Sequence, residues 1–494
     1  MGTLTGRIAP ILFVFLFSSM TQAQDMARRL HDAHDTYKEQ TFTHRRFKHH
    51  DIVPLLDSLN GRGPLTVAQV GESHEKRAIY QVTAGTGPAK VLLWSQMHGD
   101  EATATMALFD LFNFLKAEND GFDSLRQAIL TSTTLYAVPM LNPDGAERFQ
   151  RRTATGIDMN RDALRLQTPE GRLLKNLQQT LKPLVGFNLH DQNPRYSVGE
   201  TGKQAVVSFL ATAYDPARSI NDVRQRSMQL IVGMNRALQQ FVPGQVARYD
   251  DEFEPRAFGD NIQKWGTTLV LIESGGYAGD VEKMTIRRLN FVAVLTALIA
   301  IAEESYKQER VAEYKAIPEN GHALFDVLIR NATVVRNGNP VTIDIGINRE
   351  EINSDSVRRG YDRTFRYKSV VEDIGDLSTF YGLEEIDATG LTLSPARVYP
   401  DMLDSAAALR QLDLLTLQQE GITVFKVRNA KTTNYSLPLV HLLHDGKLPA
   451  RPLLPGQIPT FLLKAGNQIK YNFVNGFRQD SPMSAIGNTN GITE

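Results

Sequence analysis

Residues 90–101 read KVLLWSQMHGDE, and they join an apolar run to two polar residues that can bind metal. The run from Lys90 to Gln96 predicts a buried strand. The residues from Ala102 to Ala117 predict a helix because their apolar side chains recur at helical spacing. His98 and Glu101 therefore lie at a strand-to-helix junction. An imidazole and a carboxylate at this spacing can bind one metal ion, and zinc accepts both ligand types.

Outward from this junction, strands and helices alternate over residues 65–308. Apolar runs predict further strands at residues 134–140, 185–190 and 267–272. The alternation predicts an α/β fold with a mixed, mostly parallel central sheet and helices on both faces. Functional sites in such sheets form at the carboxyl ends of the strands. His98, Asn142, His190 and Glu273 all come at these ends, so we expect them to share one edge of the sheet.

His190 is the best candidate for a third ligand among the other histidines, because it ends a predicted strand. Two histidines and a glutamate leave one zinc position open for water. Zinc lowers the pKa of that water to roughly 7 and so provides a nucleophile at neutral pH. Glu273 ends an apolar strand, where partial desolvation raises a carboxyl pKa, and it is the candidate general base. The alternative for Glu273 is an exposed loop carboxylate.

Arginine residues lie between the first and third candidate ligands, at Arg148, Arg151, Arg152 and Arg161. Arginine keeps its charge and binds a carboxylate through two parallel N–H groups. One arginine near the metal could stabilise a developing oxyanion, and another could hold a substrate carboxylate. The alternative for Arg151 and Arg152 is a solvated charged pair.

The ordered set of motifs resembles the zinc carboxypeptidase family, the metallopeptidases related to carboxypeptidase A. The resemblance covers residues 65–308. It rests on an H-x-x-E pair, an Asn-Pro-Asp-Gly turn at residues 142–145, an arginine, an Asn-Arg pair, a strand-end histidine and a late glutamate, in that order. The resemblance implies that one Zn²⁺ ion is bound by His98, Glu101 and His190.

The same resemblance assigns further roles. Glu273 is implied to act as general base and then as acid, and Arg151 to polarise the scissile carbonyl. Asn160 and Arg161 are implied to bind the free terminal carboxylate of a peptide substrate. Arg152 is the alternative to Arg151 if the register differs by one residue. The expected activity is that of a zinc metallocarboxypeptidase.

Several residues depart from the family's pattern. Neither Tyr249 nor Tyr277 is well placed for the mobile tyrosine that the family carries before its general base, and we assign neither. Asp191, directly after His190, is predicted to orient a ligand. Arg256 could favour an acidic substrate side chain, but a salt bridge with Glu252 or Glu254 is the preferred interpretation. Gly99 is expected to provide a tight turn, and Asp100 to be an outer partner of the ligands.

Composition limits the function classes. The chain has 494 residues, a formal net charge of −1 and no cysteine, which excludes thiolate metal sites and gives no basic excess for nucleic acid. Arg7, the apolar stretch from Ile8 to Met20 and the small residue Ala23 predict a signal peptide at residues 1–23. We therefore expect an exported, bacterial protein of the periplasm or medium, with no membrane span after signal removal.

Length predicts more than one domain. We expect a catalytic domain at residues 24–310 and a charged linker at 309–320. A β-rich accessory domain is expected at 320–480, because strands are predicted at 325–335, 341–347, 422–427 and 468–474. Residues 481–494 are expected to form a disordered tail. Oligomeric state and side-chain preference stay open.

Two other functions fit the same residues. An N-acyl amino acid deacylase on this scaffold would also use a carboxylate-binding arginine. A non-catalytic binding protein could keep the fold without turnover. The complete set of zinc and base residues favours an enzyme over the binding protein.

Overall fold

The computed structural model describes residues 24–353, 365–429, 438–444, 453–479 and 491–493. They fall into two compact units. The first unit comprises Met1–Gly199 and Lys203–Gly321, and the second comprises Glu200–Gly202 and His322–Glu494. The predicted signal peptide lies outside the described residues.

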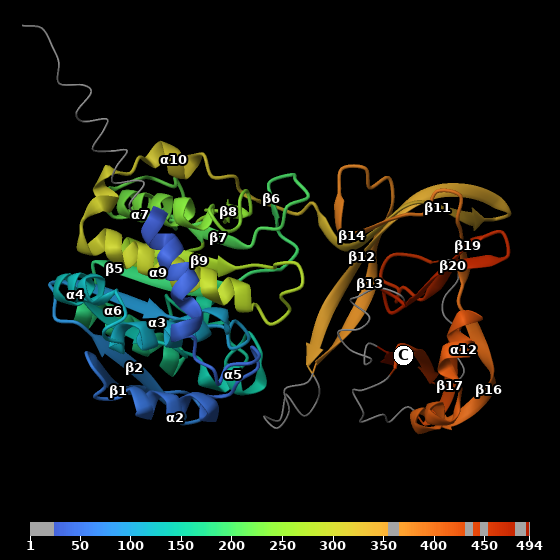
Figure 1. The fold of residues 1–494 in the computed structure, drawn as a ribbon, viewed down its shortest axis with the longest axis horizontal. Coiled ribbons are helices and arrows are strands. Elements are labelled where there is room, and N and C mark those ends of the chain that lie inside the picture. The colour runs from blue at the N-terminus through green and yellow to red at the C-terminus, as the bar shows by residue number, and fades with distance from the viewer. Residues whose placement is uncertain (1–23, 354–364, 430–437, 445–452, 480–490, 494) are drawn as a thin grey trace, which may run out of the picture. The chain divides into compact units, whose positions relative to one another are not determined.

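A mixed eight-stranded sheet forms the centre of the first unit, in the order β1-β2-β4-β3-β5-β9-β7-β8 (Figure 1). Its strands are β1 (Leu65–Glu72), β2 (Ala78–Ala84), β3 (Ala89–Trp94), β4 (Thr133–Val138), β5 (Val185–Asp191), β7 (Val207–Leu210), β8 (Val246–Arg248) and β9 (Thr268–Ser274). The four central strands β4, β3, β5 and β9 pair in parallel. The edges contain the antiparallel pairs, so the predicted fold class is confirmed.

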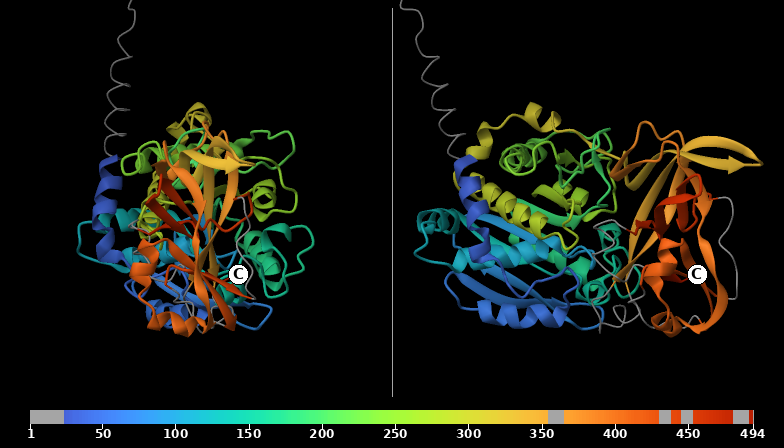
Figure 2. Two further views of the ribbon diagram at one scale, coloured as in Figure 1. Left: turned by 90° about the vertical axis from the view of Figure 1, so that its right-hand side faces the viewer. Right: turned by 45° about the vertical axis from the view of Figure 1, so that its right-hand side comes forward.

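Helices cover both faces of this sheet (Figures 1 and 2). They are α2 (His49–Leu59), α3 (Thr103–Lys116), α4 (Asp123–Ser132), α5 (Pro143–Arg148), α6 (Pro169–Leu181), α7 (Asp222–Leu238), α8 (Phe258–Lys264), α9 (Met284–Ala302) and α10 (Val311–Lys315). On one face α3, α7 and α9 pack together. On the other face α6 and α8 pack against Leu92 and Trp94 of β3. The apolar run of the opening stretch is buried because both faces of β3 are covered.

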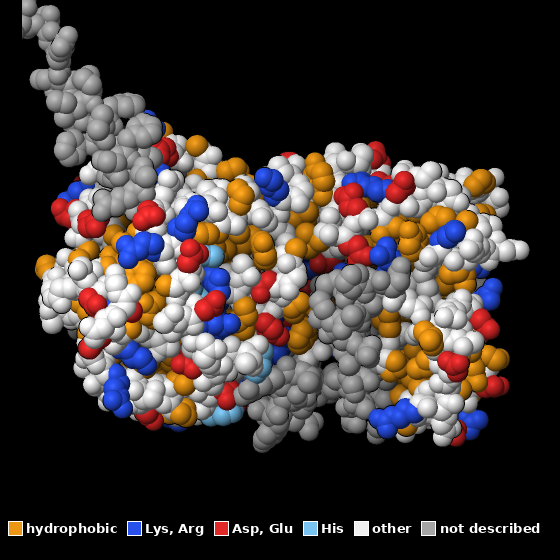
Figure 3. Space-filling model, viewed as in Figure 1, with side chains coloured by type: hydrophobic (Ala, Val, Ile, Leu, Met, Phe, Trp, Pro, Cys, Tyr) orange, Lys and Arg blue, Asp and Glu red, His pale blue; other side chains and the backbone are white. Residues whose placement is uncertain are grey.

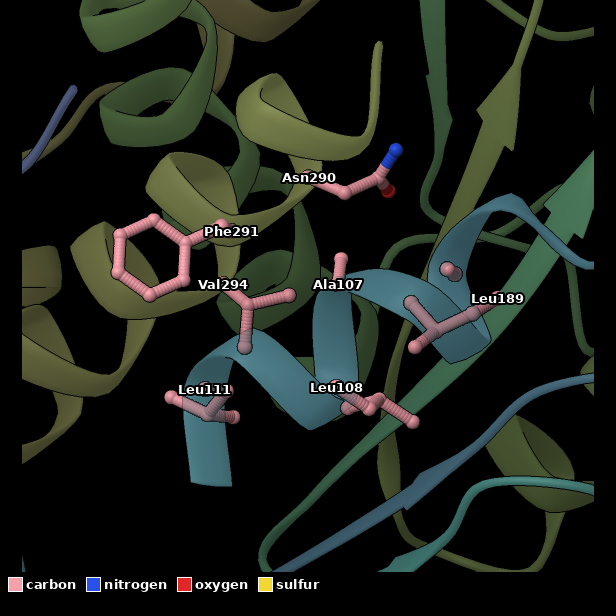
Figure 4. A pocket seen from close by; sticks show the side chains of 8 residues that line it. Ala107, Leu108, Leu111, Leu189, Asn290, Phe291 and Val294 are labelled. Atoms are coloured by element: carbon pink, nitrogen blue, oxygen red, sulfur yellow. The ribbon is translucent and has the colours of Figure 1, made fainter. Parts of the chain in front are cut away.

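Helix α9 supports the end of β9. Figure 4 shows Ala107, Leu108 and Leu111 of α3 opposite Phe291 and Val294 of α9, around a small apolar pocket behind the sheet. Asn290 Nδ2 of α9 donates to Ser274 Oγ over 2.9 Å, and Ser274 is the residue that directly follows Glu273.

Among the described helices, α9 alone is long and apolar enough to cross a membrane, and 67% of its apolar window is buried. Burial of this extent is typical of a core helix.

Residues 309–320 belong to the first unit, so the prediction of a linker there was wrong. Helix α10 forms within this stretch and packs on α7. Arg236 of α7 pairs with Glu309 over 2.7 Å and with Glu313 over 3.0 Å. The acidic side chains that suggested a solvated linker therefore pair with an arginine that lies far away in sequence.

The second unit is rich in strands, as predicted. They are β11 (Leu324–Arg336), β12 (Asn339–Asn353), β13 (Phe365–Gly375), β14 (Tyr381–Asp387), β15 (Thr392–Pro395), β16 (Arg397–Ser405), β17 (Ile422–Asn429), β18 (His441–His444), β19 (Phe461–Ala465), β20 (Gln468–Val474), β21 (Phe477–Arg478) and β22 (Ile492–Thr493). They form an eight-stranded sheet and a four-stranded parallel sheet, β16-β17-β18-β22, with helix α12 (Leu414–Gln419) on β17. Most of the predicted tail lies outside the described residues. The tail prediction was wrong for Ile492–Thr493, which pairs with β18.

Charged side chains are mixed on the visible surface. Lys and Arg alternate with Asp and Glu over the face of the first unit that Figure 3 shows, without a large area of one sign. This distribution agrees with the near-zero formal net charge of the sequence.

Candidate metal centre

The loop after β3 carries His98, and the Asn-Pro-Asp-Gly segment holds this loop in place. Asn142 caps α5, because its Oδ1 accepts a hydrogen bond from Gly145 N over 2.9 Å. Its Nδ2 donates to Met97 O over 3.2 Å. One buried amide therefore joins the start of α5 to the residue before His98. The segment was predicted as a turn, and in the structure it opens a helix.

Gly99 lies in the turn after β3, and close packing requires a glycine at this position. Its φ is not positive. A Cβ atom on Gly99 would lie 2.0 Å from the carbonyl carbon of Gly145 and 2.2 Å from Ala146 N. The main chains of the His98 loop and α5 therefore meet where only glycine fits. Gly99 also lies in a tight turn, in which Glu101 N donates to His98 O over 3.1 Å, so the prediction of a turn at this residue is confirmed.

His98, Glu101 and His190 come together in a buried cluster. Nδ1 of His98 lies 2.7 Å from Oε1 of Glu101, and Nδ1 of His190 lies 2.6 Å from Oε2 of the same carboxylate. One ligand atom from each residue lies within 4.8 Å of the other two. Two imidazoles and a carboxylate with this convergence match the donor set of a catalytic zinc site, which keeps one position for water.

Asp158 fixes the orientation of His98. Its Oδ1 lies 3.1 Å from His98 Nε2, which leaves Nδ1 to face Glu101. Arg151 joins the same group, with Nη2 3.0 Å from Asp158 Oδ2 and Nη1 3.2 Å from Glu101 Oε1. Outer carboxylates of this kind set the tautomer of a ligating histidine. Arg152 instead donates to Gly156 O, so the structure brings Arg151, and not its neighbour, to the cluster.

Replacing Asp158 by asparagine is expected to weaken zinc binding about 10–100-fold, because the charged partner of His98 Nε2 is lost. The measurement is the zinc dissociation constant from competition with a chelator. Asp250→Asn removes the same charge at an exposed position and should leave that constant unchanged. Equal zinc affinity in the two variants would show that Asp158 does not position His98.

The electrostatics of the cluster differ between the two histidines. Burial disfavours the His98 cation, but Glu101 and Asp158 more than offset burial and raise the pKa of His98 to about 9. Burial lowers the pKa of His190. For Glu101, burial favours the neutral form, but the two imidazoles prevail and hold its pKa below the usual range. At pH 7 without metal, His98 therefore carries a proton that a metal ion must displace.

Zinc affinity is expected to rise with pH, by about tenfold per unit while one proton is displaced, and to level off above about pH 9. The sign follows from the raised pKa of His98, because its imidazole stays protonated until the pH passes that value. Calorimetric titration in buffers of different ionisation enthalpy measures the protons released. An affinity that is flat between pH 6.5 and 9 would contradict this expectation.

Glu273 lies beside His190 on the neighbouring strand. The two residues are direct register partners in the parallel pair of β5 and β9, so their side chains leave the same face of the sheet. Burial, followed by the nearby Glu101 charge, raises the pKa of Glu273 well above its usual value. The residue keeps partial solvent exposure. A carboxyl group with these properties is suited to accept a proton near neutral pH.

Tyr249 is the tyrosine whose hydroxyl lies in this electrostatic environment. Burial and then the charge of Glu273 raise the pKa of Tyr249 well above the usual 10. It follows β8, and its N–H donates to Phe209 O over 2.9 Å. Tyr277 is 36% exposed. The sequence supported neither residue, and the charge of Glu273 acts on Tyr249 in the structure.

Asp191 and Lys283 join the strand ends that carry His190 and Glu273. The main-chain N–H of Asp191 donates to Glu101 Oε2 over 3.2 Å. Lys283 Nζ lies 3.0 Å from Asp191 Oδ2 and 3.0 Å from Ser274 O. The contact to Glu101 comes from the main chain of Asp191, while its carboxylate contacts Lys283 and Thr103, so a ligand-orienting role of this side chain stays a prediction. Asp100 has no hydrogen bond to a ligand within the described residues, and the outer carboxylate that contacts His98 is Asp158.

Asn160 and Arg161 lie next to Asp158 and contact a loop from far along the chain. Asn160 Oδ1 accepts from Phe258 N over 2.9 Å. Arg161 Nε lies 3.2 Å from Glu254 Oε2. Arg256 pairs with Glu254 over 2.8 Å, so the preferred interpretation of Arg256 as a salt-bridge partner is confirmed.

Sequence reasoning missed Asp158 and Lys283. The signal for Asp158 was its place two residues before the Asn160–Arg161 pair. No local pattern marked Lys283, because its partners lie up to 92 residues away.

Comparison with known proteins finds a similarity to one family. Residues 52–180 match the model of the zinc carboxypeptidase family. The match contains His98, Glu101, Arg151, Asn160 and Arg161, and it ends before His190 and Glu273. In the folded chain, these last two residues lie beside the matched ones.

Curated relatives and solved structures show the same similarity. Probable carboxypeptidase 2 of Trichophyton verrucosum is 28% identical over 148 residues, 28% of this chain and 27% of the relative. Carboxypeptidase 2 of Trichophyton rubrum is 27% identical over 146 residues, 28% of this chain and 26% of the relative. The matched part thus spans about a quarter of these relatives. A metallo-carboxypeptidase of Pseudomonas aeruginosa, solved with (2-guanidinoethylmercapto)succinic acid, is 17% identical, with a TM-score of 0.41 and coverage of 52% of this chain and 70% of that chain.

A second solved structure, of a putative carboxypeptidase from Burkholderia mallei, is 17% identical with a TM-score of 0.42, and it covers 52% of this chain and 68% of that chain. The family match lies wholly within the first unit. The resemblance predicted from the sequence is confirmed, because residues 52–180 of the first unit match the zinc carboxypeptidase family model.

Proposed function

We propose that this protein is a zinc-dependent metallocarboxypeptidase that removes the C-terminal residue of a peptide. The observation that supports the proposal most strongly is the convergence of His98, Glu101 and His190 beside Glu273. The three candidate ligands and the candidate proton acceptor lie at the carboxyl ends of the central strands, the edge at which sites form in such sheets.

Zinc bound by His98, Glu101 and His190 would polarise a water molecule and the substrate carbonyl. Glu273 would take a proton from the attacking water and return it to the leaving amine. Its raised pKa makes the carboxyl strong enough as a base for the first step and as an acid for the second. Arg151 is half-exposed and faces the ligand cluster, where its N–H groups would stabilise the charge that develops on the carbonyl oxygen.

The exopeptidase preference would come from Arg161 and Asn160. A guanidinium binds a carboxylate through two N–H groups, and Arg161 lies three residues after Asp158, the partner of His98. A substrate that ends in a free carboxylate would thereby be held with its last peptide bond near the ligand cluster. The export predicted from residues 1–23 would give this enzyme peptide substrates outside the cytoplasm.

The N-acyl amino acid deacylase is the second candidate, because the same arginine would hold its substrate. The test supplies the zinc-loaded protein with a library of peptides and a panel of N-acyl amino acids, and measures released amino groups. We expect release from peptides with a free C-terminus. Release from N-acyl amino acids alone would support the deacylase, and release from neither would support a binding protein.

A further inference from the structure

Glu254 contacts the guanidinium of Arg161, which is proposed to bind the substrate carboxylate. Its Oε2 lies 3.2 Å from Arg161 Nε. The main-chain N–H of Glu254 donates to Asp260 Oδ1 over 3.2 Å, and this bond helps to hold Glu254 in place. In the absence of substrate, a carboxylate of the chain therefore stands where a peptide carboxylate is proposed to bind.

The loop with Glu254 is fastened to the segment with Arg161. Phe258 N donates to Asn160 Oδ1 over 2.9 Å, and Ala163 N donates to Arg256 O over 3.1 Å. These two hydrogen bonds involve residues on either side of Arg161 and residues shortly after Glu254. The two main-chain segments that carry the pair are therefore held together by the fold of the first unit.

Glu254 contacts Arg256 much more fully than Arg161. Arg256 donates three hydrogen bonds to the Glu254 carboxylate, from its main-chain N, Nε and Nη2, over 3.0, 3.0 and 2.8 Å. Arg161 offers Nε alone, and its Nη1 donates to Asn160 O over 2.8 Å. Hydrogen bonds from Arg256, followed by the charge of Arg161, lower the pKa of Glu254 to about 2, so the carboxylate is ionised throughout the working range.

This asymmetry allows an exchange without an unpaired charge. An incoming carboxylate can bind Arg161 through two N–H groups, which is a stronger arrangement than the single contact of Glu254. When Glu254 leaves Arg161, Arg256 still neutralises it. The pair is partly solvated, with 38% of the Arg161 side chain and 28% of the Glu254 side chain exposed, so its separation has a small free-energy cost.

We propose that Glu254 is an internal competitor for the substrate carboxylate, with Arg256 as the partner that retains it when substrate binds. The inference rests on the proposed function of Arg161. Glu254 then sets the affinity for substrates that end in a carboxylate, and Arg256 moderates that competition. A purely structural salt bridge would instead affect stability or kcat, in the same direction for both residues.

The test compares two variants that should change KM in opposite directions. Glu254→Gln is expected to lower KM about twofold to fivefold with kcat unchanged, because the charged competitor is lost. Arg256→Gln is expected to raise KM by a similar factor, because Glu254 then turns fully to Arg161. Glu252→Gln, which removes a charge from an exposed side chain of the same loop, is the matched control and should equal the wild type.

The substrate is a peptide that the zinc-loaded wild type shortens, assayed beside the same peptide with a C-terminal amide. Opposite shifts of KM for the free peptide, absent for the amide, support the competitor. Three results would overturn the competitor: KM shifts in the same direction, a change in kcat only, or equal shifts for Glu252→Gln. In each case wild-type turnover would still support the proposed function. No turnover by the wild type would overturn both.

Discussion

Replacing Glu273 by glutamine is expected to lower kcat/KM about 10²–10⁴-fold, the range for loss of a general acid–base group. The amide keeps the shape of the side chain but cannot accept the proton. Glu273 is a strand neighbour of His190 and not one of the three converging ligands, so zinc content should stay at the wild-type level. The measurement combines steady-state kinetics with metal analysis of the same protein sample.

Glu252→Gln serves as the control for the loss of one carboxylate, because this side chain is exposed. It should keep wild-type kcat/KM. Wild-type activity in Glu273→Gln would remove Glu273 from the mechanism. Loss of zinc in that variant would instead show that Glu273 contributes to the metal site.

Replacing His190 by alanine is expected to weaken zinc binding about a hundredfold and to abolish turnover. A zinc site that holds its ion with a total of about 12 kcal/mol over four ligands loses about 3 kcal/mol per ligand, or about a hundredfold in affinity. The change also leaves Glu101 Oε2 without the imidazole that faces it at 2.6 Å. Zinc content after dialysis and turnover at saturating peptide are the two measurements.

His74→Ala is the matched control, because His74 is exposed and is not one of the three converging residues. That variant should keep zinc and activity. A His190→Ala protein that is folded by circular dichroism and still holds one zinc ion per chain would contradict the assignment of His190. Added zinc should restore activity to the wild type after chelation, but not to His190→Ala.

The central strands could be predicted because their sequences are short apolar runs that end in polar residues. Residues 185–190 were predicted as a strand, and β5 spans Val185–Asp191. Buried parallel strands have this pattern since both faces are covered. Strand β8, by contrast, has only three residues, Val246–Arg248, too few for any periodicity.

The ligand set could be predicted because each ligand comes at a strand end, and the ends of parallel strands share one edge. The surroundings of the site could not be predicted in the same way. Asp158 reaches His98 across 60 residues, and Glu254 reaches Arg161 across 93, so no local spacing records either contact. Gly99 shows the same limit, because the requirement for glycine there comes from the close backbone of Gly145 and not from its own φ.

Mass spectrometry of peptides incubated with the zinc-loaded protein tests the central claim most directly. The substrates are N-acetylated peptides with varied last residues, each paired with its C-terminal amide. The account predicts products shorter by one C-terminal residue from the free peptides, none from the amides, and none from either after chelation. Intact peptides, internal cleavage, equal cleavage of the amides or cleavage that persists in chelator would contradict a zinc carboxypeptidase.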